Sequence, residues 1–242
     1  MMINDRIAVV AAGKMSFSMT HPADCNAYLV KAAHSCILID CGVGLANDAI
    51  LEKIRSVTSL PVSHILITHH HADHIGGLYE LGERLHARVI VPALEAASVL
   101  RGDEETTGLV VARNAGYYPA DYHLSPCRID ETVSAGDVLT IDGERIDVLS
   151  GAGHSLGGVC YFFREGGMLF SGDLLMHGGK INLQNIPGAD LRKYSDSVQA
   201  LELLDVQQFY PGHGLFSLTD GKEHVRMAAA AFRSLGVPPN FV

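Results

Sequence analysis

Short apolar runs bounded by glycine, proline or polar residues fill much of the first 130 residues, and this pattern is typical of buried strands. A helical repeat interrupts it where Ile50, Leu51 and Ile54 share one face. A second helix is expected after Gly76, with leucines on one face, and an alanine-rich helix after Pro92. The predicted strands of this part are Ile7–Ala12, Asn26–Lys31, Cys36–Asp40, His64–Thr68 and Arg88–Val91.

The later part of the chain repeats this order of strands and then helices. Turns at Asp142-Gly143 and at residues 165–167 join neighbouring strands into hairpins. Helices are expected over residues 190–205 and over about 220–235. The predicted strands are Val138–Ile141, Arg145–Leu149, Val159–Phe163, Met168–Ser171 and Gln208–Tyr210.

Two rounds of strands and helices predict an α/β (α+β) chain in which two sheets pack together with helices outside. With 242 residues, 48% of them apolar, the chain is long enough to bury one sizeable core, so a single domain, 1–242, is expected. Residues 102–130 are less regular. They form either a lid over a pocket or a packed surface excursion.

Charge and cysteine content narrow the partners and the compartment. The net charge is −9, and nucleic acid and anionic membranes need clustered Lys and Arg, so neither is expected as a partner. Five cysteines without a C-x-x-C pair favour a reduced, cytoplasmic location. No run approaches the ~18 apolar residues of a transmembrane helix, and the first apolar run is too short for a signal peptide. The oligomeric state stays open, homo-oligomers included.

Thirteen histidines are unusual beside only 18 Lys and Arg, and several cluster directly after a predicted strand. The motif Thr68-His69-His70-His71-Ala72-Asp73-His74 has H-x-H-x-D-H spacing. Side chains alternate along an extended chain, so His69 and His71 can reach one metal ion. Asp73 and His74 lie where the loop turns into a helix and can face a second ion. This spacing predicts a metal site.

Three further residues could complete such a site. His154, Asp173 and His213 each follow the end of a predicted strand. Each is flanked by glycine, which lets the backbone approach closely. Together with the first motif they provide five histidines and two aspartates at strand ends, the inventory expected of a two-metal site.

These motifs, in this order, resemble the metallo-β-lactamase superfamily, of the kind that includes glyoxalase II, from about Asp24 to about Gly214. The resemblance implies the metallo-β-lactamase fold, a four-layer αββα sandwich of two similar halves, about 1–130 and 131–242. Asp40 matches the family's acidic residue at the end of an early strand, which orients a ligand histidine. The implied ligands are His69, His71 and His154 for the first metal, and Asp73, His74 and His213 for the second, with Asp173 bridging both.

The resemblance implies a metal-dependent hydrolase that uses a metal-bound hydroxide to cleave an ester, thioester, lactone or amide of a small molecule. Asp73 could also pass a proton. The nitrogen and oxygen donors suit two divalent ions, zinc first, and they also accept iron or manganese. In the polar loop after Asp173, the candidate substrate contacts are His177, Lys180 and Asn182.

Three alternative functions stay open. A persulfide-dioxygenase-like oxidoreductase would bind one iron through two histidines and a carboxylate, but its Gly-Arg segment is replaced here by Gly178-Gly179-Lys180. A nuclease of the same superfamily is disfavoured by the net charge of −9. A non-catalytic binding protein would be expected to have lost ligands, whereas every ligand position is filled here.

Overall fold

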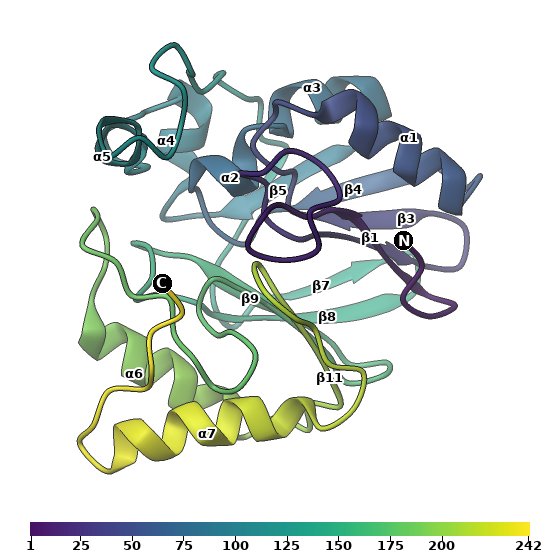
Figure 1. Cartoon of the computed structure of the whole chain (residues 1–242). Helices are drawn as coiled ribbons and strands as arrows, with labels where there is room; N and C mark the ends of the chain where they lie inside the picture. Colours follow the sequence, from purple (N-terminus) through teal and green to yellow (C-terminus); the bar gives the residue numbers. More distant parts are fainter. The chain divides into compact units, whose positions relative to one another are not determined.

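The structure, a computed structural model, describes residues 1–242 and divides into two compact units, Met1–Thr132 and Val133–Val242 (Figure 1). The halves predicted from the sequence, 1–130 and 131–242, have nearly these bounds. That the two units form a single domain stays a prediction. Each unit is built on one sheet with its own helices.

The first unit has a mixed sheet of six strands in the order β1-β2-β3-β4-β5-β6, the last of which reaches across the boundary. Neighbouring strands are antiparallel from β1 to β3 and parallel from β3 to β5. The parallel strands place their carboxyl ends at one edge, which is where polar loops gather in α/β sheets. The strands are β1 (Ile7–Ala11), β2 (Ala27–Lys31), β3 (Cys36–Ile39), β4 (Val62–Leu66), β5 (Arg88–Pro92) and β6 (Glu131–Val133).

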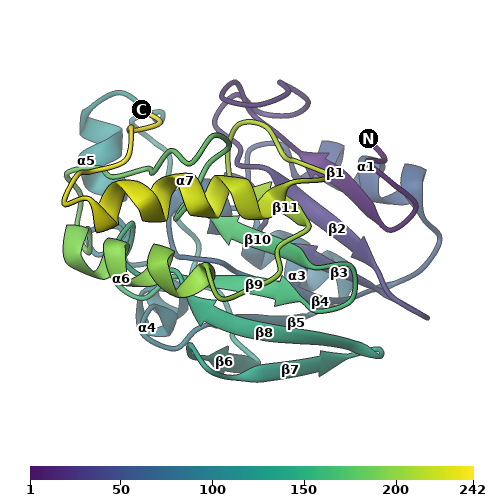
Figure 2. The same cartoon turned by 90° about the horizontal axis from the view of Figure 1, so that it is seen from below.

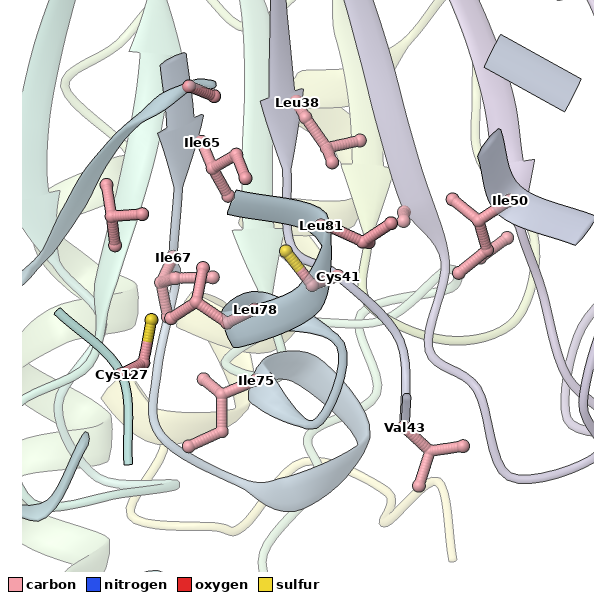
Figure 3. Close-up of a cluster of buried hydrophobic side chains, with 14 of the residues drawn as sticks. Leu38, Cys41, Val43, Ile50, Ile65, Ile67, Ile75, Leu78, Leu81 and Cys127 are labelled. Atoms are coloured by element: carbon pink, nitrogen blue, oxygen red, sulfur yellow. The ribbon is translucent and has the colours of Figure 1, made fainter. Parts of the chain in front are cut away.

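Helices of the first unit bury apolar faces against this sheet. Leu78 and Leu81 of α3 lie in a core cluster with Ile65 from β4 and Leu38 from β3 (Figure 3). Ile50 of α1 belongs to the same cluster, as its helical spacing predicts. The helices are α1 (Asn47–Val57), α2 (Ala72–Ile75), α3 (Leu78–Leu85), α4 (Ala96–Arg101) and α5 (Leu109–Asn114).

The second unit has a five-stranded sheet in the order β11-β10-β9-β8-β7. Only the β10–β11 pair is parallel. Helices α6 (Leu191–Leu201) and α7 (Gly221–Arg233) lie side by side over this sheet (Figure 2). The strands are β7 (Val138–Ile141), β8 (Glu144–Ser150), β9 (Val159–Phe163), β10 (Met168–Gly172) and β11 (Gln208–Pro211).

Two element predictions need correction. The strand predicted at His64–Thr68 is β4, two residues earlier, because Val62 already pairs with Cys36 of β3. Two elements were not predicted. They are α5, which lies within residues 102–130, and β6, which begins directly after that segment. Tyr122 is only 7% exposed, and its hydroxyl donates to the Val43 carbonyl over 2.7 Å. The segment around it is therefore a packed excursion of the first unit.

No helix of the structure is both long and apolar enough to cross a membrane. All five cysteines are free thiols, and all are buried. They behave as small apolar groups of the core, since Cys36, Cys41 and Cys127 belong to the same apolar cluster as Leu78.

Candidate metal centre

The histidine-rich motif of the first unit spans the loop after β4 and the start of α2. Residues 68–71 lie on the loop that leaves the sheet after Leu66, and Asp73 and His74 lie in α2, which begins directly after His71. The ring of His69 lies 4.6 Å from that of His71 and 4.1 Å from that of His74, measured between centroids. Asp73 is the partly exposed member, with its Oδ2 atom 3.8 Å from His74 Nε2. The four side chains predicted as ligands therefore gather at one place.

Asp40 fixes the orientation of His74. It follows β3 with φ at +60°, and its Oδ2 atom lies 2.8 Å from His74 Nδ1. Its carboxylate also accepts hydrogen bonds from the Thr68 backbone N–H and hydroxyl, both 2.8 Å long. A carboxylate only accepts, so Nδ1 of His74 carries the proton and the Nε2 lone pair is available to a metal ion. Asp40 is thus in hydrogen-bond contact with His74, and its role in orienting a metal ligand stays a prediction.

Cys25 is a neighbour of this pair that no sequence motif singles out. The ligand atoms of Cys25, Asp40 and His74 lie within 4.8 Å of one another. Burial raises the pKa of the Cys25 thiol to about 12, although the nearby His74 opposes the rise. The thiol therefore stays protonated at neutral pH, and Cys25 packs against His74 rather than offering a thiolate.

Three strand ends of the second unit meet at one edge of its sheet. β8 and β10 run in the same direction because both are antiparallel to β9, and β11 is parallel to β10. Their carboxyl ends therefore share one edge, with Gly172 paired to Pro211. The residues that follow these three strands are the predicted ligands His154, Asp173 and His213.

The side chains of these three residues converge. His154 Nε2 lies 3.5 Å and His213 Nε2 3.4 Å from the same oxygen, Oδ2 of Asp173. His154 Nδ1 lies 2.5 Å from the backbone carbonyl of Asn182. A carbonyl only accepts, so Nδ1 donates a proton to it, and Nε2 is the ring nitrogen that remains as a candidate metal donor.

The candidate substrate residues lie in different surroundings. Asn182 is 2% exposed, and its Nδ2 donates to Asp173 Oδ2 over 2.8 Å, so it lies among the predicted ligands. His177 is exposed, and its ring lies 4.3 Å from that of His224 on α7. Lys180 is also exposed, and its backbone carbonyl accepts a hydrogen bond from the Met176 N–H. A substrate contact through His177 or Lys180 stays a prediction.

A cavity of about 410 Å³ lies within the first unit, and its wall includes Gly76, which follows His74 by two residues. Tyr79, Tyr122 and Leu45 give it aromatic and apolar walls, and Glu80 contributes a carboxylate that Asn47 and Arg84 already engage. The remaining lining residues are Val43, Gly44, Pro119, Asp121, His123 and Ser125.

Each unit thus presents donors of the kind that divalent metals bind. The first unit offers three imidazoles and one carboxylate, and the second offers two imidazoles and one carboxylate. In both units a histidine donates from Nδ1 to a fixed acceptor, the Asp40 carboxylate in one and the Asn182 carbonyl in the other. Neutral imidazoles with a fixed tautomer and carboxylates fit zinc, iron or manganese.

The model of the metallo-beta-lactamase superfamily matches residues 22–213 of this chain. The chain belongs to the metallo-β-lactamase superfamily. A metallo-beta-lactamase family protein of Thermus thermophilus, TTHA1429, superposes with a TM-score of 0.74 at 22% identity, over 96% of this chain and 81% of its own. The predicted α/β class and metallo-β-lactamase fold are therefore confirmed.

Two curated relatives are more similar in sequence. The acyl-coenzyme A thioesterase MBLAC2 of Gallus gallus is 30% identical over 229 residues, which cover 88% of this chain and 79% of the relative. The hydroxyacylglutathione hydrolase of Rhodobacter capsulatus is 31% identical over 207 residues, covering 81% and 70%. This metallo-β-lactamase superfamily chain is thus similar to one enzyme named as a thioesterase and to another named as a hydrolase.

Proposed function

We propose that this chain is a binuclear metallo-hydrolase of small-molecule thioesters. Its ligands would be His69, His71 and His154 for one ion and Asp73, His74 and His213 for the other, with Asp173 shared. The observation that carries the proposal is the convergence of two imidazole Nε2 atoms on Asp173 Oδ2, in a chain that also has a histidine motif with the family's spacing. A carboxylate approached in this way is suited to bridging two ions.

When bound, two divalent ions supply an acidified water as nucleophile and polarise a carbonyl group. The chain's own residues then have separate tasks. Asp40 and Asn182 keep Nδ1 of His74 and of His154 protonated, so that Nε2 is always the donor atom. Asp73 is the most exposed of the carboxylates, at 16%, and its second oxygen can hold a proton at the site.

The thioester class is supported by the two curated relatives, one named as a thioesterase and the other as a hydrolase of an acylated glutathione. Esters, lactones and amides share the same electrophilic carbonyl, so the donor set accepts them as well. Zinc is the metal we propose, because neutral imidazole and carboxylate donors satisfy it without redox chemistry.

The deciding experiment is metal analysis of the purified protein followed by a thioester, ester and lactone panel in one buffer. We expect about two ions per chain and the fastest turnover on thioesters. Asp173→Ala should abolish both metal uptake and turnover. Asp196→Ala, which removes an exposed carboxylate from α6 in the same unit, should change neither. Full turnover by Asp173→Ala would refute the shared-ligand role, and one iron per chain with oxygen consumption would refute the hydrolase.

A further inference from the structure

Asn182 touches two of the proposed ligands of the second unit at once. Its backbone carbonyl lies 2.5 Å from His154 Nδ1, and its side-chain amide donates to Asp173 Oδ2 over 2.8 Å. It is 2% exposed, so water does not compete for these bonds. A displacement of Asn182 would therefore disturb both His154 Nδ1 and Asp173 Oδ2.

Tyr194 of α6 anchors Asn182 from within the unit. The Asn182 backbone N–H donates to the Tyr194 hydroxyl over 3.0 Å. That hydroxyl has the carbonyl oxygens of Asp173, 2.9 Å away, and of Leu174 as acceptors. Burial raises the pKa of Tyr194 well above its ordinary value, so the hydroxyl keeps the proton it donates.

Residues 239–241 hold the segment on either side of Asn182. The Ile181 N–H donates to the Pro239 carbonyl over 3.0 Å, and the Phe241 N–H donates to the Ile181 carbonyl over 2.8 Å. This short parallel bridge runs beside the loop that follows β10, as the yellow end of the chain does in Figure 1.

Asn240 completes the attachment on the other side. Its Oδ1 accepts from the Leu183 N–H over 3.0 Å, and its Nδ2 donates to the Leu183 carbonyl over 2.8 Å. A side-chain amide has its acceptor and its donor on separate atoms, which lets it bond both backbone groups of one residue. Asp could keep the first bond but not the second, and Ala could keep neither.

The same segment also reaches the third proposed ligand. Gly214 follows His213, and a Cβ added there would lie 3.2 Å from Cε2 of Phe241. The Phe241 ring therefore packs against the backbone that carries His213. Residues 239–241 thus contact the loop of His213 directly, and they reach His154 and Asp173 through Asn182.

We propose that residues 239–241 are a strap that fixes Asn182 as a positioning residue, so that His154 and Asp173 present their donor atoms to metal ions. This inference rests on the proposed function for the identity of the ligands. It adds that metal affinity in the second unit depends on a segment that contributes no ligand, with Asn240 as its specific contact.

The test compares Asn240→Ala with Ser234→Ala in the full chain. Ser234 lies close to the strap in sequence and also makes one side-chain hydrogen bond to a backbone carbonyl, that of Ala231, but has no bond to the 181–183 segment. Metal affinity is measured by competition with a chelator. Cobalt-substituted protein gives an absorption spectrum that reports ligand geometry. We expect Asn240→Ala to weaken metal binding about 10-fold or more and to change the cobalt spectrum. Ser234→Ala should do neither.

Hydrogen exchange of the metal-free protein provides a readout independent of activity. The Leu183 amide should exchange faster in Asn240→Ala, and Asn240→Asp, which keeps the acceptor, should restore most of its protection. Wild-type affinity and an unchanged cobalt spectrum in Asn240→Ala would overturn the strap, even if that variant unfolds at a lower temperature. A wild-type chain that binds metal but hydrolyses no thioester would overturn the proposed substrate and leave this comparison decisive.

Discussion

His70 lies inside the ligand motif but faces away from the proposed metals. Its Nδ1 lies 2.7 Å from Ser98 Oγ, and its backbone N–H donates to Glu95 Oε2 over 2.7 Å. Ser98 in turn donates to the Glu95 carbonyl. All three residues are buried, Glu95 at 1% exposure. Glu95 therefore anchors the backbone between His69 and His71, the two proposed ligands on either side.

Loss of this anchor should weaken the fold. Glu95→Ala removes the acceptor of the buried His70 N–H and should destabilise the protein by about 1–3 kcal/mol, the cost of an unsatisfied buried donor. Glu95→Gln keeps an oxygen in place and should retain most of that stability. Urea unfolding of the metal-free protein measures both. Equal losses in the two variants would show that the hydrogen bond to His70 is not what Glu95 contributes.

A pH dependence follows from His224, which is 8% exposed on α7. Burial and, after it, the nearby His177 lower the pKa of His224 below its ordinary value of 6.5, while Glu223 and Asp220 oppose this shift. The unfolded chain therefore takes up the proton at a higher pH than the folded chain does. Stability is complete above the ordinary pKa and is lost as the pH falls from there through the lowered one.

We expect His224→Asn to lose less stability than the wild type between pH 7 and about pH 5. Asn keeps an acceptor for the Gly178 N–H, which donates to His224 Nδ1 over 3.2 Å. The comparison uses urea midpoints of metal-free protein, since bound ions would protect the ligand histidines. His34→Asn, at an exposed histidine, is the control and should follow the wild type. Parallel curves for His224→Asn and the wild type would contradict the prediction.

At the scale of elements, the turn that follows α2 is in close contact with the loop after β3, and this contact holds α2 in place. A Cβ at Gly76 would overlap both the Val43 carbonyl oxygen and the Tyr122 hydroxyl. Gly44 meets the same junction with φ at +83°, and its own Cβ would overlap the Gly76 carbonyl oxygen. The turn between α2 and α3 is therefore packed against the loop after β3 without room for side chains.

Gly76→Ala should consequently destabilise the chain by about 1–3 kcal/mol, the range for overpacked cores. Gly82→Ala is the matched control within α3. There the new methyl group would meet only Val89 Cγ2 at 3.4 Å, and a helical backbone gains about 0.5–1 kcal/mol from this change. Opposite shifts in the thermal unfolding temperature are the expected result. A neutral Gly76→Ala would mean that the loop after β3 yields easily.

The sequence was sufficient for elements whose apolar pattern is strong. The strand predicted at Val159–Phe163 matches β9, because a run of five apolar residues has the length of a buried strand and is too short for a buried helix. α5 was missed because Leu109 is the one residue it buries, so it shows no apolar stripe. The predicted start of β4 was two residues late because pairing with β3, a tertiary effect, begins at Val62, and the register shifts past the polar Ser63.

The residues of the candidate site likewise include some that the sequence reveals and others that depend on tertiary contacts. The proposed ligands could be selected from the sequence because their spacing and their flanking glycines are local in sequence. The contacts of Asn240 and Glu95 could not be predicted. Asn240 bonds the backbone of a residue 57 positions away, and Glu95 bonds the backbone of a residue 25 positions away. Asn182 was selected for its polarity as a substrate contact, whereas its hydrogen bonds to His154 and Asp173 support the positioning role proposed above.

At the scale of the whole molecule, the proposed assignments divide the ligands between two ions. His69 and His154 are assigned to one metal, and His213 to the other. Substitutions that remove ligands of a single ion should not be additive, because the second removes binding that is already lost. Substitutions that remove ligands of different ions should deplete both, and the metal content of double variants therefore tests the assignment.

We expect His69→Ala, His154→Ala and the double variant of these two each to retain about one ion per chain, since all three disturb the same site. The double variant His69→Ala with His213→Ala should retain close to none. Metal analysis after desalting measures all four proteins, and circular dichroism verifies that each is folded. If His69→Ala with His154→Ala lost both ions while each single variant lost one, the two histidines would serve different metals. The division of ligands between the ions would then have to be redrawn, although the chain would still bind two.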